Sequence, residues 1–234
     1  MCITRASAWA RPLDPALQRW LLRVGEIGRA VQSGSLTPLG WQEAMQEAYV
    51  AFSPEEWVAF IDMDRLLEGL RYPDVKFGAV KDVPWPAVEG FPADLRFGHK
   101  LFVYRKGSST PPHAHNNLVS AHWVLRGEVR TRTFDRVEDL EAAILLQPTR
   151  DEVSRPGALV SMSDARDNVH WFEGVSEQPS ISFDIPIGVT PDKQYRHPAE
   201  AYNQIYLDPT VARRADGRIE APIIKFDDSK TKFG

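Results

Sequence analysis

The sequence predicts a mainly β fold, a single β-barrel that follows an α-helical N-terminal region. Helix start signals and apolar residues at helical spacing fill the first third of the chain, whereas the second half consists of short runs with a period of two. A length of 234 residues suits one large core with additions. We expect three parts: a helical region over residues 1–72, a barrel over 73–190, and a C-terminal extension over 191–234 that packs on the barrel or on a partner subunit.

Three helix starts are visible in the N-terminal region. Asp14 and Thr37 are each followed by proline, which favours the first turn of a helix, and Ser53 with Glu56 forms a capping box. Apolar residues recur at helical spacing after these starts. We therefore expect helices between residues 14 and 70 that pack on the protein's own core, in preference to an aromatic groove for a partner.

The second half of the chain shows strand patterns. Several prolines within residues 71–100 predict a surface connector, and an acidic run over 135–141 indicates an exposed loop. Runs rich in β-branched and aromatic residues are typical of a sandwich or barrel, and they cover residues 101–105, 123–134, 158–162 and 180–185. Glu128, Arg130 and Arg132 alternate along one run, where they line a polar pocket or, as we favour, a solvated sheet face.

Composition narrows the classes of partner. The net charge of -4, a pI near 5.9 and the lack of a long basic run argue against a nucleic-acid or anionic-membrane surface, which leaves a small molecule as the expected partner. The single cysteine, Cys2, excludes an intrachain disulfide and a cysteine-rich zinc module. Because charged residues interrupt every apolar stretch before it reaches membrane-spanning length, we expect a cytoplasmic protein.

His113 and His115 are the residues most informative about function. Alternate residues of a strand point to the same face, so these two histidines would direct both imidazoles at one point inside a barrel. His170 offers a third imidazole, directly before Trp171 and Phe172. We predict that the three histidines hold one divalent metal ion. The two aromatic residues either wall the substrate pocket or belong to the core.

These histidines and their flanking glycines resemble the two signature motifs of the cupin superfamily. The first motif is matched by Gly107, His113, His115 and Gly127, and the second by Pro156, Gly157 and His170. The resemblance covers about residues 100 to 187. It implies a cupin β-barrel, which is a double-stranded β-helix, around a mononuclear metal site.

The resemblance also implies the type of metal site. Cupins usually carry a Glu ligand seven residues before the glycine that closes the first motif, and this chain has Ser120 there. A hydroxyl is a poor ligand for a divalent ion, so we expect a neutral three-His site similar to that of the thiol dioxygenases of the superfamily, such as cysteine dioxygenase. Fe(II) is the expected metal, with Mn, Ni or Zn as alternatives, and its open positions would take a chelating substrate and dioxygen.

Further residues are expected near this site. His122 would face the same side as Ser120, either as a fourth ligand or acid–base group or as a histidine of the barrel wall, and both residues are candidate catalytic residues. Asp184 stands where the thiol dioxygenases carry a histidine, and we expect it in the substrate pocket. His99 and His197 stand alone in loop-like segments and are expected to be solvated.

The expected function is a metal-dependent dioxygenase, an oxidoreductase that acts on a small organic molecule. One alternative is an isomerase or lyase that uses the metal as a Lewis acid. Another is a non-catalytic cupin with a sensor or regulatory role, which the long helical region favours, and an empty structural barrel also remains open. We expect a homodimer, formed through the helices or the C-terminal strand.

Overall fold

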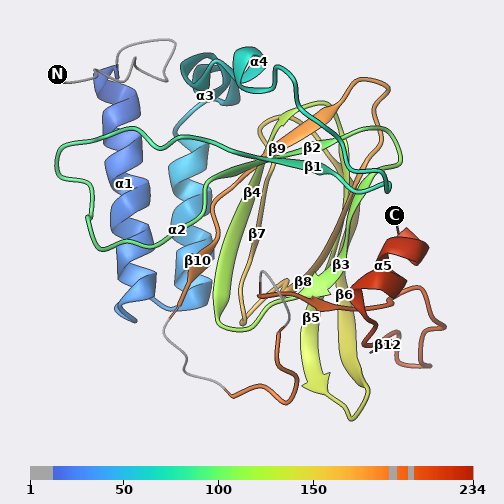
Figure 1. The fold of residues 1–234 in the computed structure, drawn as a ribbon. Coiled ribbons are helices and arrows are strands. Elements are labelled where there is room, and N and C mark those ends of the chain that lie inside the picture. Colours follow the sequence, from blue (N-terminus) through green and yellow to red (C-terminus); the bar gives the residue numbers. More distant parts are fainter. Residues whose placement is uncertain (1–12, 190–193, 200–202, 234) are drawn as a thin grey trace, which may run out of the picture.

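The computed structural model describes residues 13–189, 194–199 and 203–233 (Figure 1). The helices are α1 (Pro15–Gln32), α2 (Pro38–Val50), α3 (Pro54–Ile61), α4 (Met63–Leu66) and α5 (Phe226–Phe233). The strands are β1 (Ala79–Asp82), β2 (Lys100–Tyr104), β3 (Ser109–Ala114), β4 (Leu118–Arg126), β5 (Val129–Asp139), β6 (Ala143–Ser154), β7 (Leu159–Met162), β8 (Val169–Gly174), β9 (Ser180–Asp184), β10 (Ile187–Gly188), β11 (Ile205–Tyr206) and β12 (Ile219–Pro222). None of these described helices is long and apolar enough to cross a membrane.

In the described part of the chain the strands form two antiparallel six-stranded sheets. The first has the order β1-β2-β9-β4-β10, with β7 also paired to β4, and the second has the order β11-β3-β8-β5-β6-β12. The pairings β2-β9-β4-β7 and β3-β8-β5-β6 give the jelly roll, or double-stranded β-helix, an architecture that includes the cupins. The predicted fold class, a mainly β barrel with a helical N-terminal region, is confirmed.

The predicted helix starts are confirmed by their caps. The Asp14 side chain accepts hydrogen bonds from two amides of the first turn of α1, and the Thr37 hydroxyl accepts one from the Gly40 amide. At the start of α3, Ser53 and Glu56 each bond the backbone amide of the other. These local bonds satisfy amides that a helix leaves without partners at its N-terminus.

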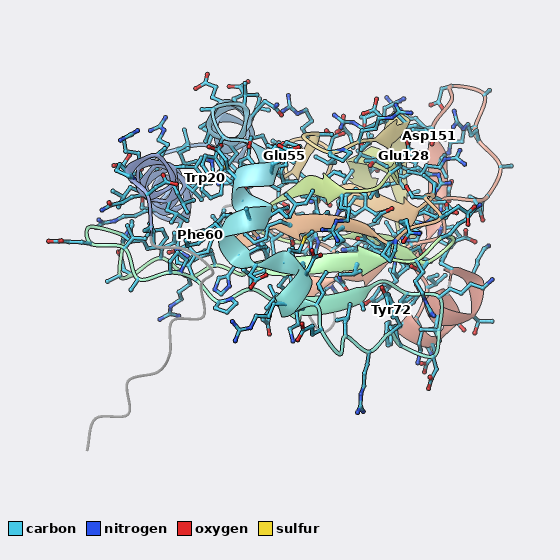
Figure 2. All side chains as sticks on the ribbon, turned by 90° about the horizontal axis from the view of Figure 1, so that it is seen from above. Trp20, Glu55, Phe60, Tyr72, Glu128 and Asp151 are labelled. Atoms are coloured by element: carbon cyan, nitrogen blue, oxygen red, sulfur yellow. The ribbon has the colours of Figure 1, made fainter. Side chains whose placement is uncertain are left out.

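The N-terminal helices cover the outer face of the first sheet (Figure 1). Trp20 of α1 lies on this helical side of the barrel (Figure 2), with its ring centroid 5.3 Å from that of Trp57 and 6.2 Å from that of Trp123 on β4. Trp57 in turn lies 4.9 Å from Phe183 on β9. Because helices cover its outer face, β4 is buried on both faces, and its alternate residues face the helices and the barrel interior.

Three segments differ from the predictions. The connector over 71–100 contains a strand, β1, which pairs with β2. The run 123–134 is two strands, because Gly127 adopts a positive φ of 69° between β4 and β5. The acidic run at 135–141 is largely the end of β5, where Arg136 and Asp139 form a 2.7 Å ion pair with side chains 3% and 16% exposed. Pairing of these charges allows a strand where charge alone indicated a loop.

The described part of the C-terminal extension packs on the second sheet. β12 pairs with the edge of β6, and α5 contacts β3. β11 pairs with β3, which sets Tyr206 opposite His113. This last pairing brings the chain around residue 204 to the predicted metal site.

Candidate metal centre

The strands bring His113, His115 and His170 together inside the barrel. His113 on β3 lies directly opposite His170 on β8 in the strand register, and His115 follows the end of β3. The ring centroids are 4.1 Å apart for His113 and His170 and 4.7 Å apart for His113 and His115. One potential ligand atom from each residue lies within 4.8 Å of the others, and all three side chains are buried. We call these residues the three-His group.

The donor set fits a divalent metal ion. The ring Nδ1–H of His113 donates to the Pro111 carbonyl at 2.8 Å, and that of His115 donates to the Asn203 carbonyl at 2.5 Å. Each Nε2 thus keeps its lone pair, and the two Nε2 atoms are 3.1 Å apart. Two adjacent ligands at about 2.1 Å from one ion would be about 3.0 Å apart at a right angle, so this separation suits a shared ion.

The three imidazoles are neutral near pH 7. Burial lowers the pKa of His115 to about 4, and it lowers the pKa of His113 and His170 well below the usual value for histidine. Proximity within the group lowers the last two further. Neutral imidazoles are the form that binds a metal. Among the described residues no carboxylate belongs to this group.

A second polar cluster lies on the inner face of the first sheet. It consists of Ser120 and His122 on β4 and of Ser182 and Asp184 on β9. The Ser120 hydroxyl donates to Asp184 Oδ1 at 2.5 Å, and His122 lies 3.3 Å from Ser182 Oγ and 3.5 Å from Asp184 Oδ2. The His122 ring centroid is 5.9 Å from that of His170, so this cluster borders the three-His group.

His122 and Asp184 are both neutral in mildly acidic solution. Burial lowers the pKa of His122 to about 3 and raises the pKa of Asp184 to about 7, although the hydrogen bond from Ser120 opposes the second effect. Their 3.5 Å contact is therefore an approach of two neutral groups, in which the protonated carboxyl faces the imidazole. An ion pair here would have to overcome the desolvation of both partners.

Asp184 is expected to make the metal-free protein less stable as the pH rises. In the unfolded chain an aspartate ionises near pH 4, whereas folded Asp184 keeps its proton up to about pH 7. Between these two pH values the folded state binds one more proton than the unfolded chain. The contribution of this proton to the free energy of unfolding is full below pH 4 and is lost as the pH rises through 7. Urea unfolding between pH 5 and pH 8 should show a loss of a few kcal/mol that is absent in Asp184→Asn.

An exposed carboxylate provides the control for this measurement. Asp82 pairs with Lys100 at the surface with 81% of its side chain exposed, so Asp82→Asn should keep the wild-type pH profile. All three proteins keep the buried histidines, so the difference between profiles reports the loss of the Asp184 carboxyl. Parallel profiles for wild type and Asp184→Asn would contradict the raised pKa.

Phe172 lies beside the three-His group, whereas Trp171 does not. The Phe172 ring centroid is 5.2 Å from that of His170 and 4.7 Å from that of His122. Trp171 points to the opposite face of β8, where it stacks under the Arg132 guanidinium at 3.9 Å and meets Phe233. Of the two aromatics expected at the pocket wall, only Phe172 lies beside the three-His group, because successive strand residues alternate between faces.

The outer face of the second sheet is charged. Arg130 forms a two-bond ion pair with Asp151, and Arg132 bonds Glu173. Figure 2 places Asp151 and Glu128 at the edge of the barrel away from α1. The side chains of Glu128 and Arg130 are exposed, as on a solvated sheet face, whereas the Arg132 side chain is only 12% exposed and packs on Trp171.

His99 and His197 lie outside the three-His group. Both are half-buried, and both bond a backbone carbonyl, that of Val83 for His99 and that of Leu140, at 2.8 Å, for His197. The expectation that they are solvated rather than ligands therefore holds only in part, because each is partly shielded and bonded to the backbone. Each histidine bonds a carbonyl of a segment distant along the chain, which the spacing of single histidines does not reveal.

Sequence patterns missed three residues from the C-terminal extension. Asn203 supplies the carbonyl that fixes His115, and Gln204 places its Nε2 3.2 Å from Nε2 of His113. The Tyr206 hydroxyl donates to Gln204 Oε1. About ninety residues separate this segment from the histidine pair, and it carries no motif that would have drawn attention to it.

Similarity to known proteins is found in structure and not in sequence. No protein-family model matches the chain, and a search of curated proteins finds no significant match. Matching solved structures include protein TT1209 from Thermus thermophilus, with 17% identity and a TM-score of 0.39 over 55% of this chain and 96% of that one.

Two further matches carry a fold name. A protein with a double-stranded beta-helix domain from Klebsiella pneumoniae has 10% identity and a TM-score of 0.37 over 53% of this chain and 84% of that one. A cupin superfamily protein from Desulfitobacterium hafniense has 14% identity and a TM-score of 0.34 over 53% and 89%. These likenesses are too remote to assign a function. By its own strand order and side chains, this chain is a double-stranded β-helix protein with a buried three-His group that could hold a metal ion.

Proposed function

We propose that this protein is a mononuclear non-haem iron oxygenase that acts on a small organic molecule. The observation that carries the proposal is the convergence of three buried, neutral imidazoles with no carboxylate in the described group. Ser120, at the position of the usual cupin Glu ligand, bonds Asp184 instead. The resemblance to the thiol dioxygenases supports this choice. When bound, a ferrous ion would supply dioxygen activation and open positions for a chelating substrate.

The residues around the group prepare it for this chemistry. The carbonyls of Pro111 and Asn203 hold the Nδ1–H of two imidazoles, which orients their Nε2 atoms and raises their basicity. Phe172 covers the group on the side of His122 and excludes water. We propose that His122 serves as the acid–base residue and that Ser120 orients the Asp184 carboxyl, whose Oδ2 lies 3.5 Å from His122 Nε2.

Oxygen consumption tests this function directly. Protein loaded with ferrous ion under anaerobic conditions should consume oxygen when mixed with aerated buffer and one of a panel of small thiols, diketones and hydroxy acids. His122→Gln should lower the rate by about 100-fold or more if the imidazole transfers a proton. No consumption with any candidate would count against an oxygenase, and oxygen-independent turnover with manganese, nickel or zinc would indicate an isomerase or lyase.

The oligomeric state and the location stay predictions. The proposed homodimer would give about twice the chain mass of 26.4 kDa in size-exclusion chromatography with light scattering. A monomer at all concentrations would contradict it. The proposed cytoplasmic location requires localisation of a tagged protein in cells.

A further inference from the structure

Gln204, in the described part of the C-terminal extension, is a polar side chain that reaches the three-His group. Its Nε2 lies 3.2 Å from Nε2 of His113. Since the Nδ1–H of His113 donates to Pro111, its Nε2 is an acceptor, and the Gln204 amide is the donor in this contact. The contact uses the lone pair through which His113 would bind a metal ion, so the amide loses this acceptor when the metal binds.

The orientation of Gln204 is set by its neighbours. The Tyr206 hydroxyl, on a side chain only 6% exposed, donates to Gln204 Oε1, which occupies the oxygen and turns the NH₂ group toward His113. The backbone beside it is anchored, because Tyr206 pairs with His113 in the β11–β3 register. On the other side, the Asn203 amide donates to the Asn116 carbonyl at 2.6 Å. Gln204 thus presents a hydrogen-bond donor, and not its oxygen, to the metal site.

The charge of the metal site indicates which kind of ligand would accept the hydrogen bond of the Gln204 amide. Three neutral ligands leave the full double charge of a divalent ion inside the barrel, and burial of an uncompensated charge is unfavourable. The nearby buried acid, Asp184, is largely protonated below pH 7 and bonds Ser120. A ligand that brings negative charge on oxygen would satisfy both the ion and the amide donor.

We propose that Gln204, oriented by Tyr206, is a specificity-determining residue that donates a hydrogen bond to an oxygen atom of a small carboxylate substrate at the metal. This inference rests on the proposed metal function and names its substrate class. The substrate oxygen replaces His113 Nε2 as the acceptor of the Gln204 amide. Gln204 therefore selects an anionic oxygen ligand over a neutral one.

Anion binding to the cobalt-loaded protein tests the inference without turnover. Cobalt(II) has visible absorption that changes when a ligand enters its coordination sphere, so acetate can be titrated as the probe, with acetamide as a neutral comparator. Gln204→Ala should weaken acetate binding about tenfold, the effect of one hydrogen bond to a charged group. Gln204→Glu should weaken it more, because a carboxylate in this place repels the anion. Tyr206→Phe should lie between wild type and Gln204→Ala.

The controls separate the inference from the metal function. Gln178 is exposed and lies in the loop before β9, so Gln178→Ala should bind acetate as wild type does. Gln204→Ala, Tyr206→Phe and Gln178→Ala should bind cobalt as tightly as wild type, and weak acetamide binding should not change among them. Equal acetate affinity in wild type and Gln204→Ala, with cobalt retained, would overturn the inference alone. Loss of cobalt in Gln204→Ala would make Gln204 a ligand and also overturn it, whereas failure of wild type to take up cobalt would overturn the proposed function as well.

Discussion

Replacement of His113 by alanine is expected to abolish binding of a divalent metal ion. His113 lies nearest to both other members of the three-His group, with centroid distances of 4.1 and 4.7 Å, and its Nε2 is 3.1 Å from that of His115. The two remaining imidazoles have centroids 5.3 Å apart and no described carboxylate joins them. Loss of an orienting partner alone costs about 10- to 100-fold in metal affinity, so loss of a ligand should cost on the order of 100-fold or more.

Metal content after dialysis measures this effect. Wild type should retain about one ion per chain, and His113→Ala should retain almost none. Added cobalt should raise the melting temperature of wild type and not that of the variant, because only a ligand that binds the folded state stabilises it. His197→Ala is the matched control, since His197 bonds the Leu140 carbonyl away from the group. Equal metal content in His113→Ala and His197→Ala would refute the three-His site.

Replacement of Trp57 by alanine is expected to produce a large loss of stability. Trp57 is fully buried between the helices and the first sheet, with ring centroids 5.3 Å from Trp20 and 4.9 Å from Phe183. Truncation of a buried Trp removes its apolar contacts and leaves a cavity, which typically lowers the unfolding free energy by about 3–5 kcal/mol. Urea unfolding followed by circular dichroism measures the change. Trp171→Ala should cost less, because Trp171 is only half-buried on the outer face of β8.

The same experiment bears on the regulatory alternative. A helical sensor module should unfold separately from the barrel, whereas helices that share the barrel core should unfold with it. Trp20, Trp57, Trp123 and Phe183 belong to one buried cluster that spans both parts. We therefore expect a single transition in wild type and in Trp57→Ala. Two transitions, with the barrel unaffected by the substitution, would favour a separable module.

The class of the fold was predictable because its signals are local. Caps at Asp14, Thr37 and Ser53 depend on residues within one helical turn, and the alternation along β4 and β9 depends on neighbours two residues apart. Strands that carry many charged residues were harder to predict from the sequence. The acidic run at the end of β5 indicated a loop, because charge alone does not reveal the register shift between Arg136 and Glu138 or the ion pair of Arg136 with Asp139.

The candidate site likewise has features that local sequence patterns predict and features that depend on the tertiary structure. The spacing of His113 and His115 pointed to one shared face without any knowledge of the fold. The neighbours of Asp184 and the approach of Gln204 depend on which strands pair, and no pattern within a short window encodes that. The outward direction of Trp171 follows from local alternation, because His170 directly before it faces inward.

The sequence by itself determined the mainly β class, the helical N-terminal region and the histidines that meet in the barrel, because strand alternation and helix capping act between residues close along the chain. The tertiary structure alone decided that Asp184 bonds Ser120 and faces His122, and that Gln204 reaches His113. The physical reason is that burial and long-range pairing select these contacts, and the same burial sets the charge of the groups that make them.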